Sequence, residues 1–385
     1  MLSLYDTRRR RRRIFRPRRG AVRLYVCGVT PYDTTHLGHA RTFLVFDVLV
    51  RHLEAAGRRV RYVQNVTDVD ESILQRAARD RESWRALARR QERAFLADMR
   101  TLGWRPPDIM PHATREIPAM RALARRLLRA RHAYRLPGGG LYYDVGSFPR
   151  YGALSRFAPA RMRKILAAQD DTRLDDARKR HPLDFALWRR VTDGPTFASP
   201  FGRGRPGWHL ECSAMAQRHL GLPLDIHGGG ADLIFPHHEA ELAQSEAAWN
   251  RPFVRFWVHV GPMRLAGEKM SKSTGNMIFV RDALRRTHPD GLRLYLLAEH
   301  YRRPFDHDGR RMAAADRLAG ALRRAAQRSG TEAWKAPVPR TALRMLDEDL
   351  DTAAVLGLLR ELTEAGSSGA LPLARHLGLR LGGRS

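Results

Sequence analysis

The segment from residue 22 to residue 68 contains the pattern that most restricts the fold. VRLYVCG (22–28) is a short apolar run typical of a buried strand, and RVRYVQNVTD (59–68) is a second one. Between them, apolar residues recur with helical spacing from about 38 to 56, and the pattern ends at Gly57. Two strands joined through a helix run parallel. The segment therefore predicts an α/β fold with a doubly wound parallel sheet.

The rest of the chain extends this pattern and interrupts it once. Helical patterns follow at about 71–102 and 114–133, and turn residues among short strands then indicate an inserted subdomain. Strand and helix patterns alternate again between 208 and 263, and only helices are expected from about 280. We expect a Rossmann-type catalytic domain in two halves (1–115 and 201–280), an inserted connective subdomain (116–200) and a shortened C-terminal helical domain (281–385).

Charge is the most unusual property of the composition. The net charge is +29, which favours a polyanionic partner, with RNA as the first candidate. Only five of the 69 basic residues are lysines, so a general bias toward arginine is an alternative explanation. The run from Arg8 to Arg13 is accordingly either a solvated basic arm or a surface that contacts phosphates.

Apolar runs and cysteines limit the class of protein further. The longest apolar stretch, FLVFDVLV, is too short to span a membrane, and the first residues do not resemble a signal peptide. The sequence therefore predicts a cytoplasmic protein without membrane contact. Two cysteines cannot form a disulfide framework in 385 residues, so each is judged by its neighbours.

Two histidines, His36 and His39, stand where the first strand gives way to the helix, in TTHLGHA. In a doubly wound sheet this loop lies at the carboxyl edge, where nucleotides bind, and a helix N-terminus there would point free N–H groups at a phosphate. Gly38 lets the backbone approach closely, and both imidazoles could donate hydrogen bonds to phosphate oxygens. Taken alone, the pair is also compatible with metal binding or with a structural role.

A second motif, KMSKS (269–273), lies in a loop with glycines on both sides. Lys269 and Lys272 could clamp a triphosphate and offset its charge while pyrophosphate leaves, although the pentapeptide alone could be a solvated loop. Together, HLGH and KMSKS resemble the two signatures of class I aminoacyl-tRNA synthetases. The resemblance implies that a carboxylate attacks the α-phosphorus of ATP, which is bound with Mg²⁺, and that an adenylate forms. Lys272 is the leading candidate for stabilising the transition state.

Both cysteines lie near residues that could hold a metal ion. Cys27 ends the first strand, and Cys212 lies in GWHLECSAMA. In FPHHEAE, His237 and Glu241 are four residues apart and so share one helix face. Two thiolates, one imidazole and one carboxylate suit zinc. The alternative is two buried free cysteines and a surface helix, but Cys27 lies only nine residues before His36, beside the expected reaction centre.

From residue 1 to about 310 the chain resembles the bacterial cysteinyl-tRNA synthetase family. The resemblance implies one zinc ion per chain, which also takes the thiolate of the substrate cysteine as a ligand, because zinc prefers a thiolate to the hydroxyl of serine. The zinc ligands that it implies are Cys27, Cys212, His237 and Glu241. The stretches that carry it include YVCGVTPYDTTHLGHART, YVQNVTDVDESIL, PLDFALW, GRPGWHLECSAMA, DIHGGGADLIFPHHEAELAQSE and GEKMSKSTGN.

The same resemblance assigns further residues to the site. ATP activation falls to His36, Gly38, His39, Lys269 and Lys272. The pocket for cysteine and the adenylate is lined by Gly28, Thr30, Thr42, Asn65, Thr67 and Trp208. Glycines permit close backbone contact and a carboxylate can accept from ribose hydroxyls, although GGG alone could be a turn. The residues expected near the adenosine are Gly228, Gly229, Gly230 and Asp232.

The motifs leave the acceptor of the activated cysteine open. The cysteine ligase of mycothiol biosynthesis makes the same adenylate but passes cysteine to glucosaminyl-inositol, and it shares the TPYD-x-THLGHA style of loop. Only about 109 residues follow Asn276, which leaves little of an anticodon-reading part. Glu241, the stretch HARTFLVFDVLVRHL and the charge of +29 favour tRNA(Cys). A non-catalytic tRNA-binding paralogue is a third hypothesis, against which the intact motifs argue. We expect a monomer that uses tRNA(Cys), L-cysteine and ATP.

Overall fold

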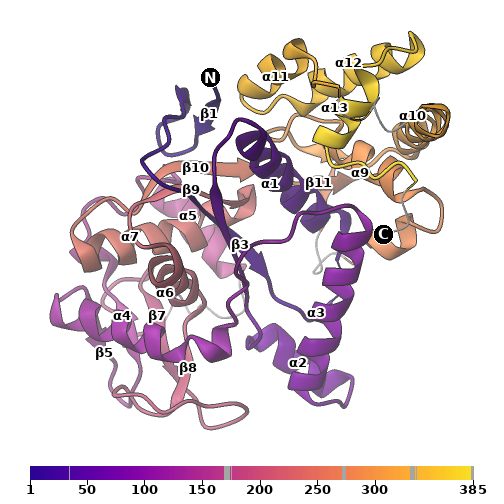
Figure 1. Cartoon of the computed structure of the whole chain (residues 1–385). Coiled ribbons are helices and arrows are strands. Elements are labelled where there is room, and N and C mark those ends of the chain that lie inside the picture. Colours follow the sequence, from indigo (N-terminus) through magenta and orange to yellow (C-terminus); the bar gives the residue numbers. More distant parts are fainter. Residues whose placement is uncertain are drawn as a thin grey trace.

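The computed structural model describes residues 1–33, 35–168, 174, 176–270, 275–329, 334 and 336–382. At its centre is a four-stranded sheet in the order β10-β9-β3-β4, in which every neighbouring pair is parallel. α1 (Leu37–Ala55) connects β3 to β4 (Figure 1), which confirms the predicted parallel unit. The strands are β3 (Val22–Val29), β4 (Val60–Val66), β9 (Leu224–Gly230) and β10 (Val254–Val260).

Alternation along β3 assigns its side chains to two separate hydrophobic cores. Leu24 and Val26 belong to a core shared with α1, whereas Cys27 belongs to a core shared with α6 (Trp208–Leu220) and α7 (His237–Trp249). Successive strand residues point to opposite faces of a sheet. The position of Cys27 in the strand therefore directs its thiol toward α6 and α7.

The pattern predicted as one helix at 71–102 forms two helices, α2 (Glu71–Arg79) and α3 (Trp84–Thr101). The prediction was wrong at the break, where Arg81 has a positive φ of 54°. A residue in this left-handed conformation interrupts a right-handed helix. The apolar residues on both sides kept a helical period, so the sequence pattern did not reveal the interruption.

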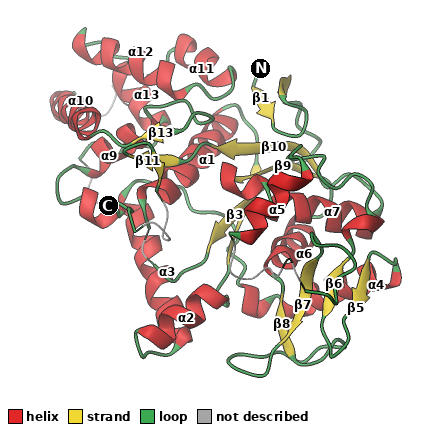
Figure 2. Ribbon diagram, turned by 180° about the vertical axis from the view of Figure 1, so that it is seen from behind, coloured by secondary structure: helices red, strands yellow, loops and turns green. Residues whose placement is uncertain are grey.

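A second sheet, antiparallel in the order β5-β6-β7-β8, is inserted between the two halves of the central sheet. Figure 2 shows its strands side by side next to α4. Short strands were expected here, whereas the boundaries of a subdomain at 116–200 stay a prediction. The elements of this region are η1 (Ala113–Arg115), α4 (Ile117–Arg129), β5 (Ala133–Arg135), β6 (Leu141–Tyr143), η2 (Val145–Ser147), α5 (Pro159–Ala167), β7 (Phe185–Arg190) and β8 (Gly204–Pro206).

The C-terminal part is helical, but the expectation of helices only was wrong at one point. β13 (Phe305–Asp306) pairs with β11 (Met263–Leu265), which also pairs with β12 (Glu268–Lys269). A strand of two residues is too short for its alternation to be detected. The helices are α8 (Val280–Ala283), α9 (Pro289–Leu297), α10 (Gly309–Arg328), α11 (Arg340–Asp347), α12 (Thr352–Glu364) and α13 (Ala370–His376).

Two buried arginines, which sequence reasoning missed, hold α1 against the C-terminal part. Arg293 of α9 donates to Asp47 of α1, and both side chains are fully buried. A buried charge without a partner is costly, so this pair fixes how α1 lies against α9. Arg41 of α1 is also buried and donates to backbone carbonyls. The carbonyls are those of Gly261, Glu299, His300 and Arg303.

The N-terminal arginine run crosses a β-hairpin. Arg8 pairs with Glu246 at 2.8 Å and Arg13 pairs with Asp6 at 2.6 Å, and both carboxylates are buried. Neither interpretation of the run, a solvated arm or a phosphate surface, holds for these two arginines, because they neutralise buried acids of the chain itself. The hairpin strands are β1 (Ser3–Asp6) and β2 (Arg11–Ile14).

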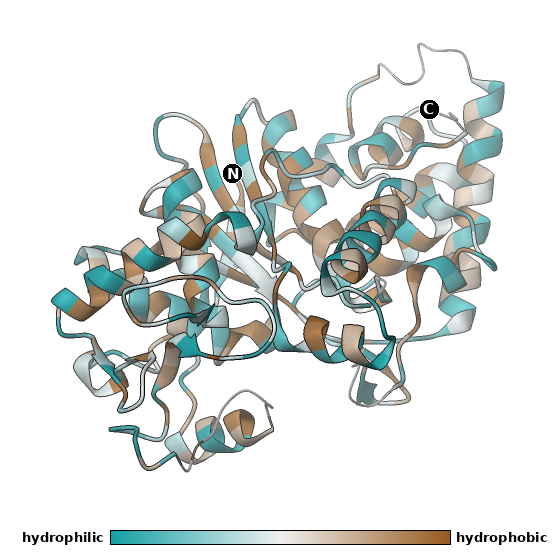
Figure 3. Cartoon of the chain, turned by 90° about the horizontal axis from the view of Figure 1, so that it is seen from below, coloured by the Kyte–Doolittle hydropathy of each residue, from teal (hydrophilic) through white to brown (hydrophobic). Residues whose placement is uncertain are grey.

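Helices in the structure carry hydrophobic and hydrophilic residues on different faces, as Figure 3 shows. In α4, for example, Leu123 and Leu127 are buried while Arg125 and Arg129 are exposed. Within the described ranges, no helix combines the length and the hydropathy needed to cross a membrane.

Candidate active site and metal centre

A cavity of about 440 Å³ lies at the carboxyl edge of the central sheet, where doubly wound folds bind nucleotides. The end of β3, the start of α1, the start of α6 and β12 meet around it. Many predicted site residues line it: Cys27, Gly28, Thr30, His36, Gly38, His39, Thr42, Trp208, Gly230, Asp232 and Lys269. Other predicted residues are instead buried within the same edge: Asn65, Thr67, Cys212, His237 and Glu241.

His36 is the N-cap of α1. Its Nδ1 accepts the backbone N–H groups of Gly38 at 3.1 Å and His39 at 3.4 Å. A ring nitrogen that accepts hydrogen bonds carries no proton, so the proton of the neutral ring sits on Nε2. The rings of His36 and His39 pack together with centroids 3.7 Å apart. His36 is therefore oriented by the backbone and keeps one N–H donor on Nε2.

The first N–H groups of α1 all have acceptors within the chain. Leu37 N–H donates to the carbonyl of Ile278 at 2.9 Å, and Ala40 N–H donates to the carbonyl of His36 at 3.1 Å. The N-cap imidazole takes the two N–H groups between them. The expectation of free N–H groups aimed at a phosphate was therefore wrong. The positive end of the helix dipole still lies at this end of α1 and favours an anion there.

The two signature motifs are joined through the backbone. Besides the bond from Leu37 to Ile278, Val280 N–H donates to the carbonyl of Thr35 at 2.9 Å, and His36 forms an isolated bridge with Phe279. The segment that follows KMSKS is thus paired with the segment that begins HLGH. This pairing brings His36 and His39 of the first motif and Lys269 and Met270 of the second to one cavity.

Lys269 and Asp232 form an ion pair at the rim of the cavity. Lys269 Nζ lies 2.8 Å from an Asp232 carboxylate oxygen, and the two side chains are 49% and 53% exposed. Lys269 belongs to β12, and Asp232 belongs to η3 (Ala231–Ile234). Lys272, the other lysine of the motif, lies outside the described residues.

The four predicted metal ligands converge in the structure. The ligand atoms of Cys27, Cys212, His237 and Glu241 all lie within 4.8 Å of one another, and all four residues are buried. The two Sγ atoms are 3.7 Å apart, and Glu241 Oε1 lies 3.4 Å from Cys27 Sγ and 3.2 Å from His237 Nε2. Two sulfurs, one nitrogen and one oxygen match the ligand preferences of zinc, so these residues fit the expected metal.

Two histidines that sequence reasoning missed join this cluster. His238 Nε2 lies 3.2 Å from Cys27 Sγ, and His227 Nε2 lies 2.9 Å from Glu241 Oε2. Together with Cys27 and Glu241 they form a second group that could hold a metal ion. Partners of this kind orient the direct ligands of a metal. The second histidine of FPHHEAE and the histidine of DIHGGG were the available signals.

Burial sets the protonation of the cluster. It raises the pKa of Cys27 well above its ordinary value and raises that of Cys212, because a thiolate is poorly solvated there. It lowers the pKa of His237 and His238 well below the ordinary value, so both rings are neutral near pH 7. Neutral imidazoles can bind a metal at once, whereas both thiols must first lose a proton.

A chain of buried hydrogen bonds runs beside the cluster and begins at Glu211, which sequence reasoning did not single out. Glu211 accepts from the Thr67 hydroxyl at 2.9 Å, that hydroxyl accepts from the Asn65 amide at 3.2 Å, and Asn65 Oδ1 accepts the N–H of Gly28 at 2.9 Å. A Cβ at Gly28 would lie 1.7 Å from the carbonyl oxygen of Asn65. This series of hydrogen bonds therefore holds the backbone directly after Cys27 in place.

The glycine triplet 228–230 serves two purposes. Gly230 lines the cavity, as expected for a residue near the adenosine. Gly228 is buried, and a Cβ there would lie 2.1 Å from Cζ of Phe46 and 2.8 Å from the carbonyl oxygen of Val258. Its small size therefore allows α1 to pack on β9, which gives Gly228 a structural reason that the sequence did not indicate.

Comparison with protein families and with curated proteins assigns the chain. Residues 14–317 match the family described as "tRNA synthetases class I (C) catalytic domain". The chain is 46% identical over 361 residues to "Cysteine--tRNA ligase" of Anaeromyxobacter sp. (strain K), covering 90% of this chain and 74% of that protein. It is 43% identical over 392 residues to the protein of the same name from Syntrophobacter fumaroxidans, covering 98% and 78%.

Solved structures agree on the fold. "Mycobacterium tuberculosis methionyl-tRNA synthetase in complex with methionyl-adenylate" superimposes with a TM-score of 0.61 at 17% identity, covering 93% of this chain and 82% of that one. A leucyl enzyme from Agrobacterium radiobacter, in a ternary complex, gives 0.61 at 12% identity, covering 95% and 84%. The chain therefore belongs to the cysteinyl-tRNA synthetase family, a family of ATP-dependent ligases with the class I catalytic fold.

Proposed function

We propose that this protein activates L-cysteine with ATP and transfers the cysteinyl group to tRNA(Cys). The observation that carries the proposal is the convergence of Cys27, Cys212, His237 and Glu241 at the edge of a cavity that His36 also lines. A thiolate-rich metal site beside an ATP cavity has the chemistry to select a thiol substrate. Relatives named as cysteine--tRNA ligases, at 43% and 46% identity, favour tRNA over an amino sugar as the acceptor.

One zinc ion per chain would be held by these four residues, and when bound it would supply a site that prefers the substrate thiolate to the hydroxyl of serine. Trp208 stacks on His237 with ring centroids 4.2 Å apart and lines the cavity, so it limits the room beside the ligands. His227 and His238 orient Glu241 and Cys27. Cysteine is thus selected by a preformed arrangement of side chains.

In this proposal ATP, with Mg²⁺, binds along His36, His39 and Lys269. Lys272 is assigned to the same role because it belongs to the KMSKS motif of the sequence. A carboxylate oxygen of cysteine forms a bond to the α-phosphorus while the bond to the β-phosphate oxygen breaks, and pyrophosphate leaves. Imidazole and ammonium donors stabilise the negative charge that grows on the phosphate oxygens and on the leaving pyrophosphate. Gly230 and Asp232 are assigned to the adenosine because they line the same cavity.

Two assays test the proposal. ATP–pyrophosphate exchange should respond to cysteine and only weakly to serine, because the metal site discriminates sulfur from oxygen. Labelled cysteine is then offered with tRNA(Cys) or with glucosaminyl-inositol at one enzyme concentration, and transfer to tRNA is expected. Transfer to the sugar alone would assign the protein to the mycothiol-type reaction, and absence of cysteine-dependent exchange would overturn the proposal. A cytoplasmic location and a monomeric state stay predictions from the sequence.

A further inference from the structure

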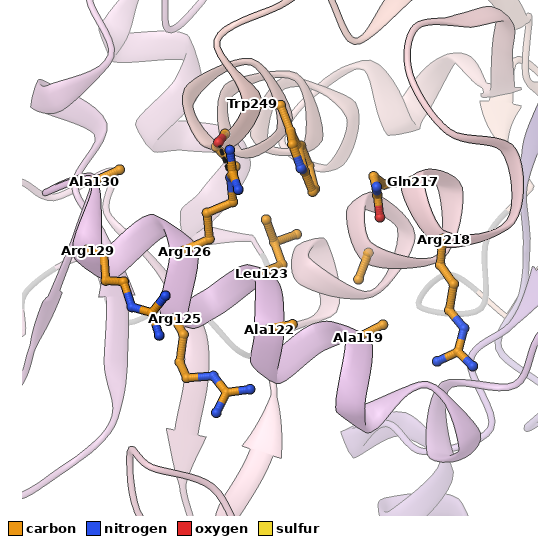
Figure 4. A pocket seen from close by; sticks show the side chains of 12 residues that line it. Ala119, Ala122, Leu123, Arg125, Arg126, Arg129, Ala130, Gln217, Arg218 and Trp249 are labelled. Atoms are coloured by element: carbon orange, nitrogen blue, oxygen red, sulfur yellow. Dashed lines mark hydrogen bonds between the residues drawn. The ribbon is translucent and has the colours of Figure 1, made fainter.

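The largest cavity described, of about 810 Å³, lies away from the ATP cavity, in a groove between α4, α6 and α7 (Figure 4). It is lined by the last turns of α6 and α7, at Arg218 and Trp249. Trp208, at the other end of α6, lines the ATP cavity. Ten residues of helix separate Trp208 from Arg218, a distance of about 15 Å along the axis. The groove is therefore a separate surface near the opposite edge of the sheet.

Arginine side chains dominate the charge of this groove. Arg125 and Arg129 are exposed, and neither has an acceptor among the residues that the structure describes. Figure 4 shows both extending away from α4, whereas Arg126 turns toward Trp249, with its guanidinium 6.0 Å from the ring centroid. On the facing helix, Arg218 lies 3.3 Å from Glu116, so part of its charge is already balanced.

The stripe of arginines on α4 is unfavourable for an isolated helix. Arg121, Arg125 and Arg129 follow one another at intervals of four residues, and like charges at this spacing repel each other. Arg121 donates to the carbonyl of Ala198, and it has no carboxylate partner within the described part of the chain. α4 contains no acidic residue at all. An anion that lay along the stripe would remove this repulsion.

The shape of the groove suits a polymer rather than a single small anion. A second cavity of about 420 Å³ shares Arg125 and continues along α4 past Arg121 to Pro200. The stripe repeats every 6 Å or so along the helix axis, comparable with the spacing of consecutive phosphates on a nucleic-acid strand. The floor is apolar, with Leu123 and the half-buried Trp249, and an aromatic ring is the kind of group on which an unpaired base stacks.

We propose that this groove binds the phosphate backbone of tRNA(Cys), in addition to the contacts that bring its acceptor end to the ATP cavity. The proposal rests on the proposed function and adds a surface to it. Charge complementarity favours RNA, because free guanidinium groups in a row bind phosphates and a neighbouring aromatic ring binds bases. Arginines 8 and 13, which the sequence offered as an RNA surface, are engaged with internal acids.

The decisive experiment compares two double variants that remove equal charge. Arg125→Gln/Arg129→Gln empties the groove of its two unpartnered arginines. Arg89→Gln/Arg93→Gln is the control, because these residues are also exposed, four apart and on one helix, α3, with no acceptor in the described residues. For both proteins the KM for tRNA(Cys) in aminoacylation is measured from low to moderate salt, alongside cysteine-dependent pyrophosphate exchange.

The groove variant should show a KM for tRNA(Cys) roughly tenfold higher at low salt, and the salt dependence of binding should become shallower by about two phosphate contacts. Its pyrophosphate exchange should equal that of the unaltered protein, and the α3 control should change KM by less than about twofold. Equal losses in both variants would mean that only bulk charge matters, which would overturn the proposal. An unchanged KM in the groove variant would also overturn it and leave an acidic protein segment as the alternative occupant. Exchange lost in the unaltered protein would instead reject the proposed function.

Discussion

The metal cluster and the lysine rim belong to one site but are built in opposite ways. The four candidate metal ligands of the cluster come from β3, α6 and α7, and all of them are buried: Cys27, Cys212, His237 and Glu241. The lysine rim consists of Lys269 and Asp232, which come from a two-residue strand and a short helical turn and are about half exposed. The cluster is therefore fixed by the core, whereas the rim is held by local contacts.

The difference indicates how the two substrates are handled. Under the proposed function, the side chains that would select cysteine are packed in the core before any substrate binds, which is what discrimination between sulfur and oxygen requires. If Lys269 binds ATP as proposed, a phosphate must replace the Asp232 carboxylate as its partner. An ion pair this exposed contributes at most about 1 kcal/mol, so ATP can displace it readily.

The largest effect is expected from breaking the cluster. Cys212→Ser should lower cysteine-dependent pyrophosphate exchange by about 10³-fold and reduce the zinc content, because a zinc–thiolate bond is lost. The KM for ATP should stay within about twofold, since the rim is untouched. Metal analysis and exchange kinetics are the measurements. Full exchange in a protein without zinc would show that the cluster has no part in selecting cysteine.

The second effect concerns pH and sharpens the contrast in burial. Because burial raises the pKa of Cys27 and Cys212, both thiols are protonated near pH 7 until a metal binds. His237 is already neutral, so it releases no proton. Zinc binding should therefore release about two protons, and affinity should rise by about 100-fold per pH unit below the thiol pKa values. Calorimetry in buffers of different ionisation enthalpy measures the proton count, and an affinity that does not vary between pH 6 and pH 8 would contradict it.

At the rim, Lys269→Ala should slow adenylate formation by about 10- to 100-fold, because one ammonium group that meets charge in the transition state is lost. The zinc content and the melting temperature should not change, since the pair with Asp232 is half exposed. Asp232→Asn is the matched variant, because it removes the carboxylate charge that pairs with Lys269 and keeps the size and shape of the side chain at position 232. Exchange kinetics and a melting curve are the measurements. A large drop in melting temperature would show that the Lys269–Asp232 pair has a structural role.

The smallest effect is expected at Glu211, which supports the cluster without joining it. Glu211→Ala should raise the KM for cysteine by about tenfold, because the chain through Thr67 and Asn65 no longer holds Gly28. Glu211→Gln keeps an acceptor for the Thr67 hydroxyl and should behave nearly like the unaltered protein. The KM for ATP separates a positioning role from general damage. An equal rise in the KM values for cysteine and ATP, or a Gln variant as impaired as the Ala variant, would contradict a positioning role for these hydrogen bonds.

The sequence predicted the cluster well because its information is local and chemical. Cysteine, histidine and glutamate are the residues that bind zinc, and the spacing of His237 and Glu241 in one helix can be read directly. It predicted the surroundings less well. Glu211 and Arg41 gain their roles through partners far away in the chain, and His227 of β9 reaches Glu241 of α7 only when strand and helix pack together, so no helical or strand spacing reveals them. The break at Arg81 and the strand at 305–306 were missed because both are shorter than a detectable period.

By itself, the sequence determined the class of fold, the two signature motifs and the residue types that suit ATP and zinc, because period, spacing and side-chain chemistry are local properties. The tertiary structure decided which groups stay available. In the folded protein the first N–H groups of α1 donate hydrogen bonds to His36 and to the carbonyl of Ile278, and Arg8 and Arg13 pair with carboxylates of the same chain. The tertiary structure left Arg125 and Arg129 in a groove without an acceptor among the residues that the structure describes. Availability depends on which distant groups are packed alongside, and that is settled only when the sheet, the helices and the hairpin come together.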